Sequence, residues 1–436
     1  MIHHGDCVEV MAAMDPDSID AIVTDPPYGL EFMGKGWDHG VPGVPFWTEV
    51  LRVAKPGAHL VAFGGTRTHH RLMCAIEDAG WEIRDCLMWL YGSGFPKSLD
   101  VGKAIDKAAG VGRVDLGPSP NWREAKRDNG QSMNPVPNEA RITAPATDAA
   151  KQWDGWGTAL KPAWEPIVLA RKPLTDTVAQ NVQQCGTGAL NVDGCRVAHT
   201  DEGDLAASQA KNPGRTDRVT SSVYGTDRPQ QSVNTSGRWP ANVVLDEEAA
   251  RTVDEQTGDL PTGTAVRRNV GHSSRHGASF GVGGSRDGDM REDVTFGDNG
   301  GASRFFYCAK ASRAEREAGL EGVVVRTKAA SGGAQGAESS GVEYEAAQGI
   351  GLNRIQRTTN HHPTVKPVAL MRWLVRLVTP PKGTVLDPFM GSGSTGVACG
   401  LEGFHFIGLE LEAEYIPLAR ARIRHATRQP GLWDTV

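Results

Sequence analysis

TVLDPFMGSGST, residues 384–395, is the stretch that decides the fold of this chain. Thr384-Val385-Leu386 is typical of a short buried strand, and the glycines that follow indicate a tight turn before a helix. A strand, a glycine-rich turn and a helix bring the backbone close to a ligand and direct helix N–H groups at an anion. For the glycines taken alone, an ordinary tight strand-to-helix turn is the plainer alternative.

A second motif, Asp25-Pro26-Pro27-Tyr28, follows the apolar run at residues 21–23. The prolines remove backbone donors and leave carbonyl oxygens beside the Asp25 carboxylate, a set of acceptors that suits an amino group. Tyr28 offers a face on which a flat ring can stack. Ligands of an open α/β sheet bind beyond the carboxyl ends of its strands, so the two motifs are expected to share one crevice. A rigid Pro-Pro turn is the plainer alternative.

The rest of the pattern predicts an α/β fold with a parallel sheet, because short apolar strands alternate with helices of about ten residues. The strands are expected at 19–23, 59–63, 81–90, 164–170, 384–386 and 404–409, and the helices at 46–54, 69–79, 368–378 and 414–425. We expect residues 111–160 to form a long surface loop. Residues 1–174 and 350–436 are predicted to form one domain, interrupted by a loop-rich insertion at 175–349.

Charge, cysteine spacing and hydropathy limit the kinds of binding site and the cellular location that the sequence predicts. The net charge is −6, so any nucleic-acid surface must be a local patch. The seven cysteines are scattered, and Cys185, Cys195 and His199 lack the spacing of zinc ligands, so no metal site is expected. With no membrane-spanning run and no signal-peptide pattern, a reduced, cytoplasmic protein is expected.

Together the two motifs resemble the permuted amino-methyltransferases of DNA, the β class found in bacterial modification systems and phages. In that family the catalytic motif precedes the cofactor motif, as it does here. Gly5-Asp6-Cys7, residues 49–57 and His362-Pro363-Thr364-Val365-Lys366-Pro367 follow the same pattern, so the resemblance covers about 1–100 and 355–425. It implies a circularly permuted, Rossmann-like methyltransferase sheet, S-adenosylmethionine as cofactor, and double-stranded DNA as partner.

The resemblance also assigns roles to the cofactor residues. Asp6 and Cys7 would lie at the adenine of the cofactor, and Thr364 and Lys366 near its methionine end. Glu410 ends the next strand, where a carboxylate can bind ribose hydroxyls, although it also fits a helix N-terminal charge. The residues expected to hold the cofactor at the glycine-rich turn are Asp387, Pro388, Phe389, Gly391, Gly393, Ser394 and Thr395.

For catalysis, the resemblance implies that the target base is flipped out of the duplex. Tyr28 would stack on it, while Asp25 and the Pro26 carbonyl would accept hydrogen bonds from its amino group. Adenine N6 is favoured because Asp leads the motif, and cytosine N4 is the alternative. A nucleotide-binding dehydrogenase and a catalytically inactive DNA-binding module are alternatives from other classes. Oligomeric state stays open, with a homodimer as one possibility. The insertion would recognise the target sequence, with Arg267 and Arg268 at DNA phosphates.

Overall fold

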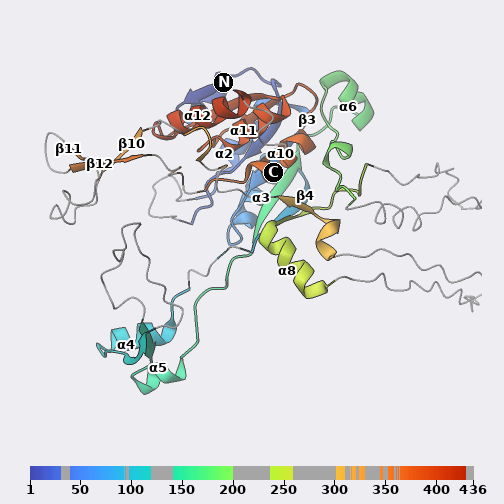
Figure 1. Cartoon of the computed structure of the whole chain (residues 1–436). Helices are drawn as coiled ribbons and strands as arrows, with labels where there is room; N and C mark the ends of the chain where they lie inside the picture. Colours follow the sequence, from blue (N-terminus) through green and yellow to red (C-terminus); the bar gives the residue numbers. More distant parts are fainter. Residues whose placement is uncertain are drawn as a thin grey trace, which may run out of the picture. The chain divides into compact units, whose positions relative to one another are not determined.

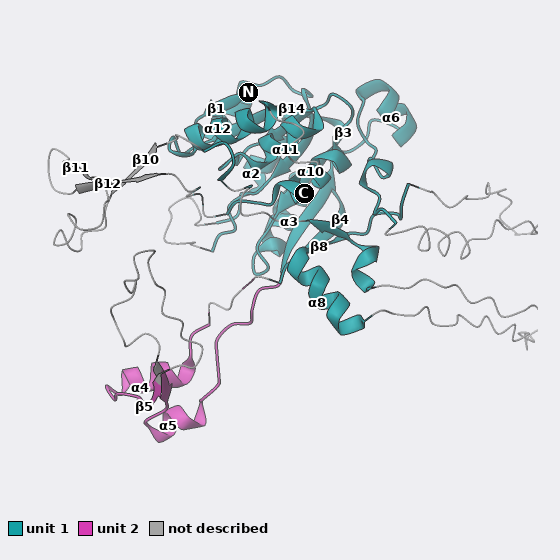
Figure 2. Cartoon of the chain, in the orientation of Figure 1, with its two compact units in different colours: residues 1–92, 164–436 teal, residues 93–163 magenta. Residues whose placement is uncertain are grey.

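The computed structural model describes residues 1–30, 40–92, 94, 98–118, 141–199, 236–258, 301–309, 315, 317–320, 324–328, 344–346, 352–357, 360, 362 and 364–428. The chain divides into two compact units (Figure 2). The larger comprises Met1–Gly92 and Trp164–Val436, and the smaller comprises Ser93–Ala163. Both ends of the chain therefore belong to one unit.

A nine-stranded sheet forms the centre of the larger unit (Figure 1). All its paired neighbours run parallel except β7, which is antiparallel to both β3 and β4. The expected parallel sheet is thus correct apart from one reversed strand. In spatial order the strands are β1 (Ile2–His4), β14 (His405–Glu410), β13 (Thr384–Asp387), β2 (Ile19–Thr24), β3 (Ala54–Phe63), β7 (Trp164–Arg171), β4 (Glu82–Leu90), β8 (Val243–Asp246) and β9 (Tyr307–Ala309).

Helices cover both faces of this sheet, as the alternation of side chains along the strands requires. On β2, Ala21 and Val23 belong to one core with α10 (Val368–Val378) and α11 (Ser394–Glu402). Ile22, between them, belongs to the opposite core with α1 (Cys7–Ala12), α2 (Val44–Val53) and α3 (His69–Asp78). The last helix, α12 (Tyr415–Arg428), packs against α11. The fold is therefore a Rossmann-like α/β sheet with two helical layers.

Strands β13 and β2 are direct neighbours, although more than 350 residues separate them in the sequence. Val385 pairs with Ala21 and Leu386 with Ile22 in parallel register. Asp387 and Asp25, which end and follow these strands, therefore lie at the same edge of the sheet. This pairing brings the two sequence motifs together.

The range expected to be an insertion contributes to the main sheet. Strands β8 and β9 both lie within 175–349, and β8 pairs with β4 while β9 pairs with β8. Two helices in that range are α6 (Val178–Cys185) and α8 (Glu247–Thr257). A separate three-stranded sheet has the order β10 (Val324–Lys328), β12 (Leu352–Arg357) and β11 (Tyr344–Ala346).

The expectation of a surface loop at 111–160 is wrong for the described part of that range. It contains β5 (Val114–Pro118), β6 (Arg141–Ala144) and α5 (Asp148–Gln152). The buried Asp106 carboxylate of α4 (Val101–Ala108) accepts hydrogen bonds from the Ala146 and Thr147 amides and from the Thr147 hydroxyl. Thr147, one of the polar residues that suggested a loop, thus caps α5 and hydrogen-bonds to a buried carboxylate.

Packing at the centre of the sheet predicts a measurable stability effect. Val61 in β3 is fully buried, so Val61→Ala removes two methyl groups and leaves a cavity. We expect the free energy of unfolding of the larger unit to fall by about 2 kcal/mol in chemical denaturation. Val178→Ala is the matched control, because Val178 is 43% exposed and should change little. Equal effects of the two substitutions would contradict this packing.

Candidate active site

A pocket with a volume of about 250 Å³ lies beyond the carboxyl ends of β2, β13 and β14. Most of the residues expected from the sequence line it, whereas Pro26, Tyr28 and Gly393 do not. The expected residues in the lining are Asp6, Cys7, Asp25, Pro27, Thr364, Lys366, Asp387, Pro388, Phe389, Gly391, Ser394, Thr395 and Glu410. Both ends of the chain thus contribute to one pocket.

The glycine-rich turn forms one wall of this pocket. Gly391 has a φ of +51°, and a Cβ atom there would lie 2.6 Å from Nε2 of His362. Its amide donates a 2.7 Å hydrogen bond to Oε2 of Glu410. Gly393 has a φ of +78°, and a Cβ atom there would meet Ala419 of α12 at 2.9 Å. Gly391 therefore allows close approach at the pocket, while Gly393 allows α12 to pack.

Asp387 holds this wall to the neighbouring strand. Its buried carboxylate accepts hydrogen bonds from the hydroxyls of Thr24 at 2.8 Å and Thr395 at 2.5 Å, and from the Phe389 amide at 3.1 Å. Burial raises the pKa of Asp387 to about 7, although these hydrogen bonds favour the charged form. Asp387 thus links β2, β13 and α11 directly beneath the pocket.

Two further carboxylates, those of Glu410 and Asp6, line the pocket. Glu410 accepts hydrogen bonds from the Gly391 and Glu412 amides, and its burial raises its pKa above the usual value. Asp6 caps α1 by accepting from the amides of Val8 and Glu9 through Oδ1. Both are therefore fixed by backbone donors, which orients them before any ligand binds.

The second motif forms a charged cluster. The Tyr28 hydroxyl lies 2.9 Å from Oδ1 of Asp25 and 3.1 Å from Oε2 of Glu165. Nζ of Lys366 lies 2.9 Å from Oδ2 of Asp25, 3.3 Å from Oε2 of Glu165 and 3.1 Å from the Tyr28 hydroxyl. We call these four side chains the Lys366 cluster. These hydrogen bonds hold the Tyr28 hydroxyl in place. The expected stacking of the Tyr28 ring on a base stays a prediction.

Lys366 stays charged inside this cluster. Its side chain is only 7% exposed. Burial alone would lower its pKa, but the carboxylates of Asp25 and Glu165 outweigh burial, so the pKa lies above the usual value for lysine. Burial, reinforced by the same two carboxylates, raises the pKa of Tyr28 well above its usual value, so the phenol stays protonated.

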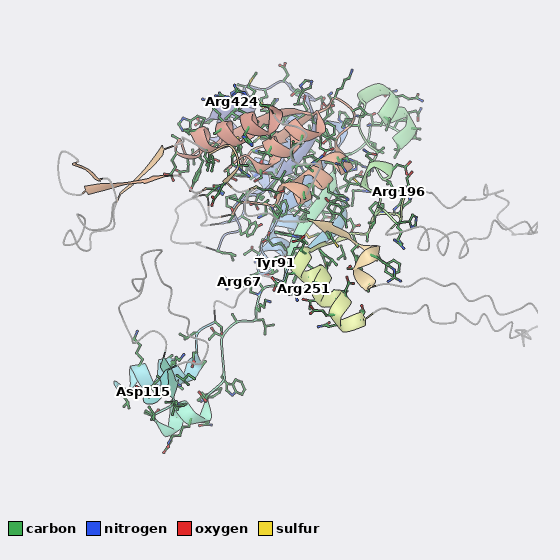
Figure 3. All side chains as sticks on the ribbon, in the orientation of Figure 1. Arg67, Tyr91, Asp115, Arg196, Arg251 and Arg424 are labelled. Carbon is green, nitrogen blue, oxygen red and sulfur yellow. The ribbon has the colours of Figure 1, made fainter. Side chains whose placement is uncertain are left out.

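Sequence reasoning missed Glu165. It precedes the apolar residues 167–170 at the start of β7, where it is easily taken for a solvated strand end. Because β7 runs antiparallel to β3 and β4, its first residues lie at the edge where those strands end. An acidic residue opening a buried strand was the available signal, but its meaning depended on the direction of that strand. Figure 3 shows the described side chains, with Tyr91 labelled just after β4.

The structure does not describe the arginines that were expected to contact DNA phosphates. Arg267 and Arg268 lie outside the described residues. In the described part of the chain, no helix is both long and apolar enough to cross a membrane.

Two curated relatives match short parts of the chain. The type II methyltransferase M2.DpnII of Streptococcus pneumoniae is 39% identical over 70 residues, which are 16% of this chain and 26% of that protein. The putative methylase YubD of Escherichia coli strain K12 is 44% identical over 68 residues, 16% of this chain and 30% of that protein. The chain thus spans less than a third of the length of these relatives.

Solved structures align over nearly the whole chain at low identity. The M1.HpyAVI complex with SAM has 14% identity and a TM-score of 0.36, covering 97% of this chain and 98% of that one. The PvuII DNA methyltransferase, which is cytosine-N4-specific, has 12% identity and a TM-score of 0.39, covering 98% of this chain and 91% of that one.

A family model supplies broader coverage. The N6_N4_Mtase model, described as DNA methylase, matches residues 19–421, a range that includes both motifs and every strand of the large sheet except β1. The chain therefore belongs to this DNA methylase family, whose cofactor is S-adenosylmethionine.

Proposed function

We propose that this chain transfers a methyl group from S-adenosylmethionine to the N6 amino group of adenine in double-stranded DNA. One observation carries the proposal: Asp25 and the glycine-rich turn open into the same pocket. A carboxylate suited to an amino group thus faces a turn suited to a nucleoside ligand. The catalytic strand β2 precedes β13 in the chain but lies beside it in the sheet, which supports the circularly permuted motif order.

The residues around the turn fit the cofactor. When bound, S-adenosylmethionine supplies an electrophilic methyl group on a sulfonium centre. Glu410, at the end of β14, would accept hydrogen bonds from ribose hydroxyls, and Asp6 would accept from the adenine amine. Gly391 lets the turn pass close to His362, another residue of the pocket lining, where a Cβ atom would clash, so its backbone would lie close to the ligand.

The Asp25 motif would bind the target amine. In a duplex the adenine amine is inaccessible, so the base must be flipped out at a cost of a few kcal/mol. Asp25 and the Pro26 carbonyl would orient the amine by accepting its hydrogen bonds, and Tyr28 would stack on the ring. Positioning of this kind supplies much of the rate of a group transfer.

Target recognition is proposed for the range 175–349. Strands β8 and β9 of that range complete the large sheet, so removing all of it would also remove part of the catalytic unit. The recognition proposal therefore concerns the parts of this range outside these two strands. Loops that follow a rigid sheet are common carriers of binding specificity.

Analysis of modified bases tests the function directly. We expect purified protein, S-adenosylmethionine and unmethylated duplex DNA to yield N6-methyladenine after digestion to nucleosides and mass spectrometry. N4-methylcytosine as the product would reassign the target base, and absence of both with folded, cofactor-bound protein would refute methyl transfer.

Removing the Asp25 carboxylate should separate chemistry from cofactor binding. Asp25→Ala is expected to lower the methylation rate at least about 10²-fold, because the amine loses its acceptor. Affinity for S-adenosylmethionine, measured by calorimetry, should change little. Asp17→Ala is the matched control, since Asp17 is half-exposed and forms an ion pair with Lys172 in the described part of the chain. A near wild-type methylation rate in Asp25→Ala would show that this mechanism is wrong.

Filling the space at Gly391 should affect the cofactor instead. Gly391→Ala places a methyl group against His362, and we expect at least about tenfold weaker binding of S-adenosylmethionine, equal to about 1.4 kcal/mol. Gly403→Ala is the matched control, because Gly403 has a φ of +76° but nothing within 4 Å of the added Cβ. Both substitutions carry similar backbone strain, so equal binding by the two variants would contradict a cofactor site at the turn.

A further inference from the structure

The Tyr28 hydroxyl lies between two carboxylates. Its oxygen is 2.9 Å from Oδ1 of Asp25 and 3.1 Å from Oε2 of Glu165. A phenol has one proton and can donate it to only one of these oxygens at a time. The hydroxyl can therefore exchange a proton with either side without any movement of the ring.

The surroundings of the two carboxylates differ. Asp25 lines the pocket, whereas Glu165 lies outside its lining. A base and a cofactor in the pocket would cover Asp25, while the Glu165 side chain, 21% exposed, would keep its contact with solvent. A proton that reaches Asp25 during the reaction thus has a continuous hydrogen-bonded path to a carboxylate outside the pocket.

Lys366 fixes the charge of the path. Its ammonium contacts both carboxylates and the phenol oxygen, and it has no lone pair with which to accept a proton. Two carboxylates and one ammonium leave the Lys366 cluster with a net charge of about −1, which one added proton neutralises. The cluster can therefore hold one released proton without accumulating positive charge.

We propose that Tyr28 and Glu165 carry away the proton that the methylated amine releases, an inference that rests on the proposed function. The N–H bond of the amine breaks as an O–H bond forms on Asp25. Asp25 then passes its proton to the Tyr28 oxygen while the original Tyr28 proton moves to Oε2 of Glu165, which releases it to water. Each step breaks one bond to hydrogen and forms another, and Asp25 returns to its charged form.

Two other titratable groups face the cluster. Burial and the carboxylate of Glu165 raise the pKa of Tyr91 to about 12, against the opposing effect of Lys366, so Tyr91 stays protonated at neutral pH. Asp387 lies beneath the pocket and interacts with Asp25, but its hydrogen bonds go to Thr24, Thr395 and the Phe389 amide. In the described structure, neither group takes part in the hydrogen bonds that connect Asp25, Tyr28 and Glu165.

The test compares Glu165→Gln, Tyr28→Phe and the double variant. Glu165→Gln keeps an oxygen that can contact Lys366, but an amide cannot take a proton from Tyr28 near neutral pH. Tyr28→Phe keeps the ring and removes the hydroxyl. Each single variant should lower kcat by about tenfold or more. The double variant should be no slower than the slower single variant, because both changes interrupt the same path.

The pH profile separates a proton path from a purely structural role. The loss in both single variants should be largest at low pH and shrink as pH rises, because hydroxide then removes the proton directly. Affinity for S-adenosylmethionine should stay at the wild-type value, since neither side chain lines the pocket. Glu82→Gln is the matched control, because Glu82 is an ion-paired carboxylate at the far end of β4, 2.6 Å from Arg171.

The outcomes distinguish the two proposals. A wild-type protein that methylates no DNA would overturn the proposed function and this path with it. An active wild type with Glu165→Gln at the rate of Glu82→Gln would overturn the path alone. Losses that multiply in the double variant, or that stay constant with pH, would also overturn it by showing two independent structural effects.

Discussion

One buried positive charge organises the candidate active site. Lys366 is removed from water, and an unpaired ammonium there would be strongly unfavourable, so opposite charges must surround it. Asp25 comes from the end of β2 and Glu165 from the start of β7, while Lys366 precedes α10. Three segments distant in sequence are thereby held together. Removal of Lys366 would leave the carboxylates of Asp25 and Glu165 together at the pocket without a positive charge between them.

The reversed direction of β7 makes this arrangement possible. In a wholly parallel sheet only carboxyl ends of strands meet at the ligand-binding edge. Because β7 is antiparallel to β3 and β4, its amino-terminal residues reach that edge. Glu165 can then face Asp25 and Tyr28 from the adjoining part of the sheet. A single antiparallel strand thus adds a second carboxylate to the Lys366 cluster.

The pocket has a common wall for its two proposed ligands. β2 and β13 pair directly, and the hydroxyl of Thr24 donates to the carboxylate of Asp387 across that pair. The turn that would hold the cofactor therefore cannot shift far without moving the motif that would hold the amine. Methyl transfer depends on the alignment of donor and acceptor, so this coupling of the two halves serves the proposed reaction.

The sequence by itself determined the local elements and most of the pocket. The strand at 384–386, the glycine-rich turn and helix 368–378 follow from short-range patterns of apolar residues and glycine, and the structure reproduces them. Such short-range patterns do not predict the direction of a strand within the sheet or the contacts between residues far apart in the chain. The reversal of β7, the entry of β8 and β9 into the sheet and the meeting of Glu165 with Lys366 were decided only by tertiary structure. The physical reason is that strand pairing and the neutralisation of a buried charge depend on groups far apart in the chain.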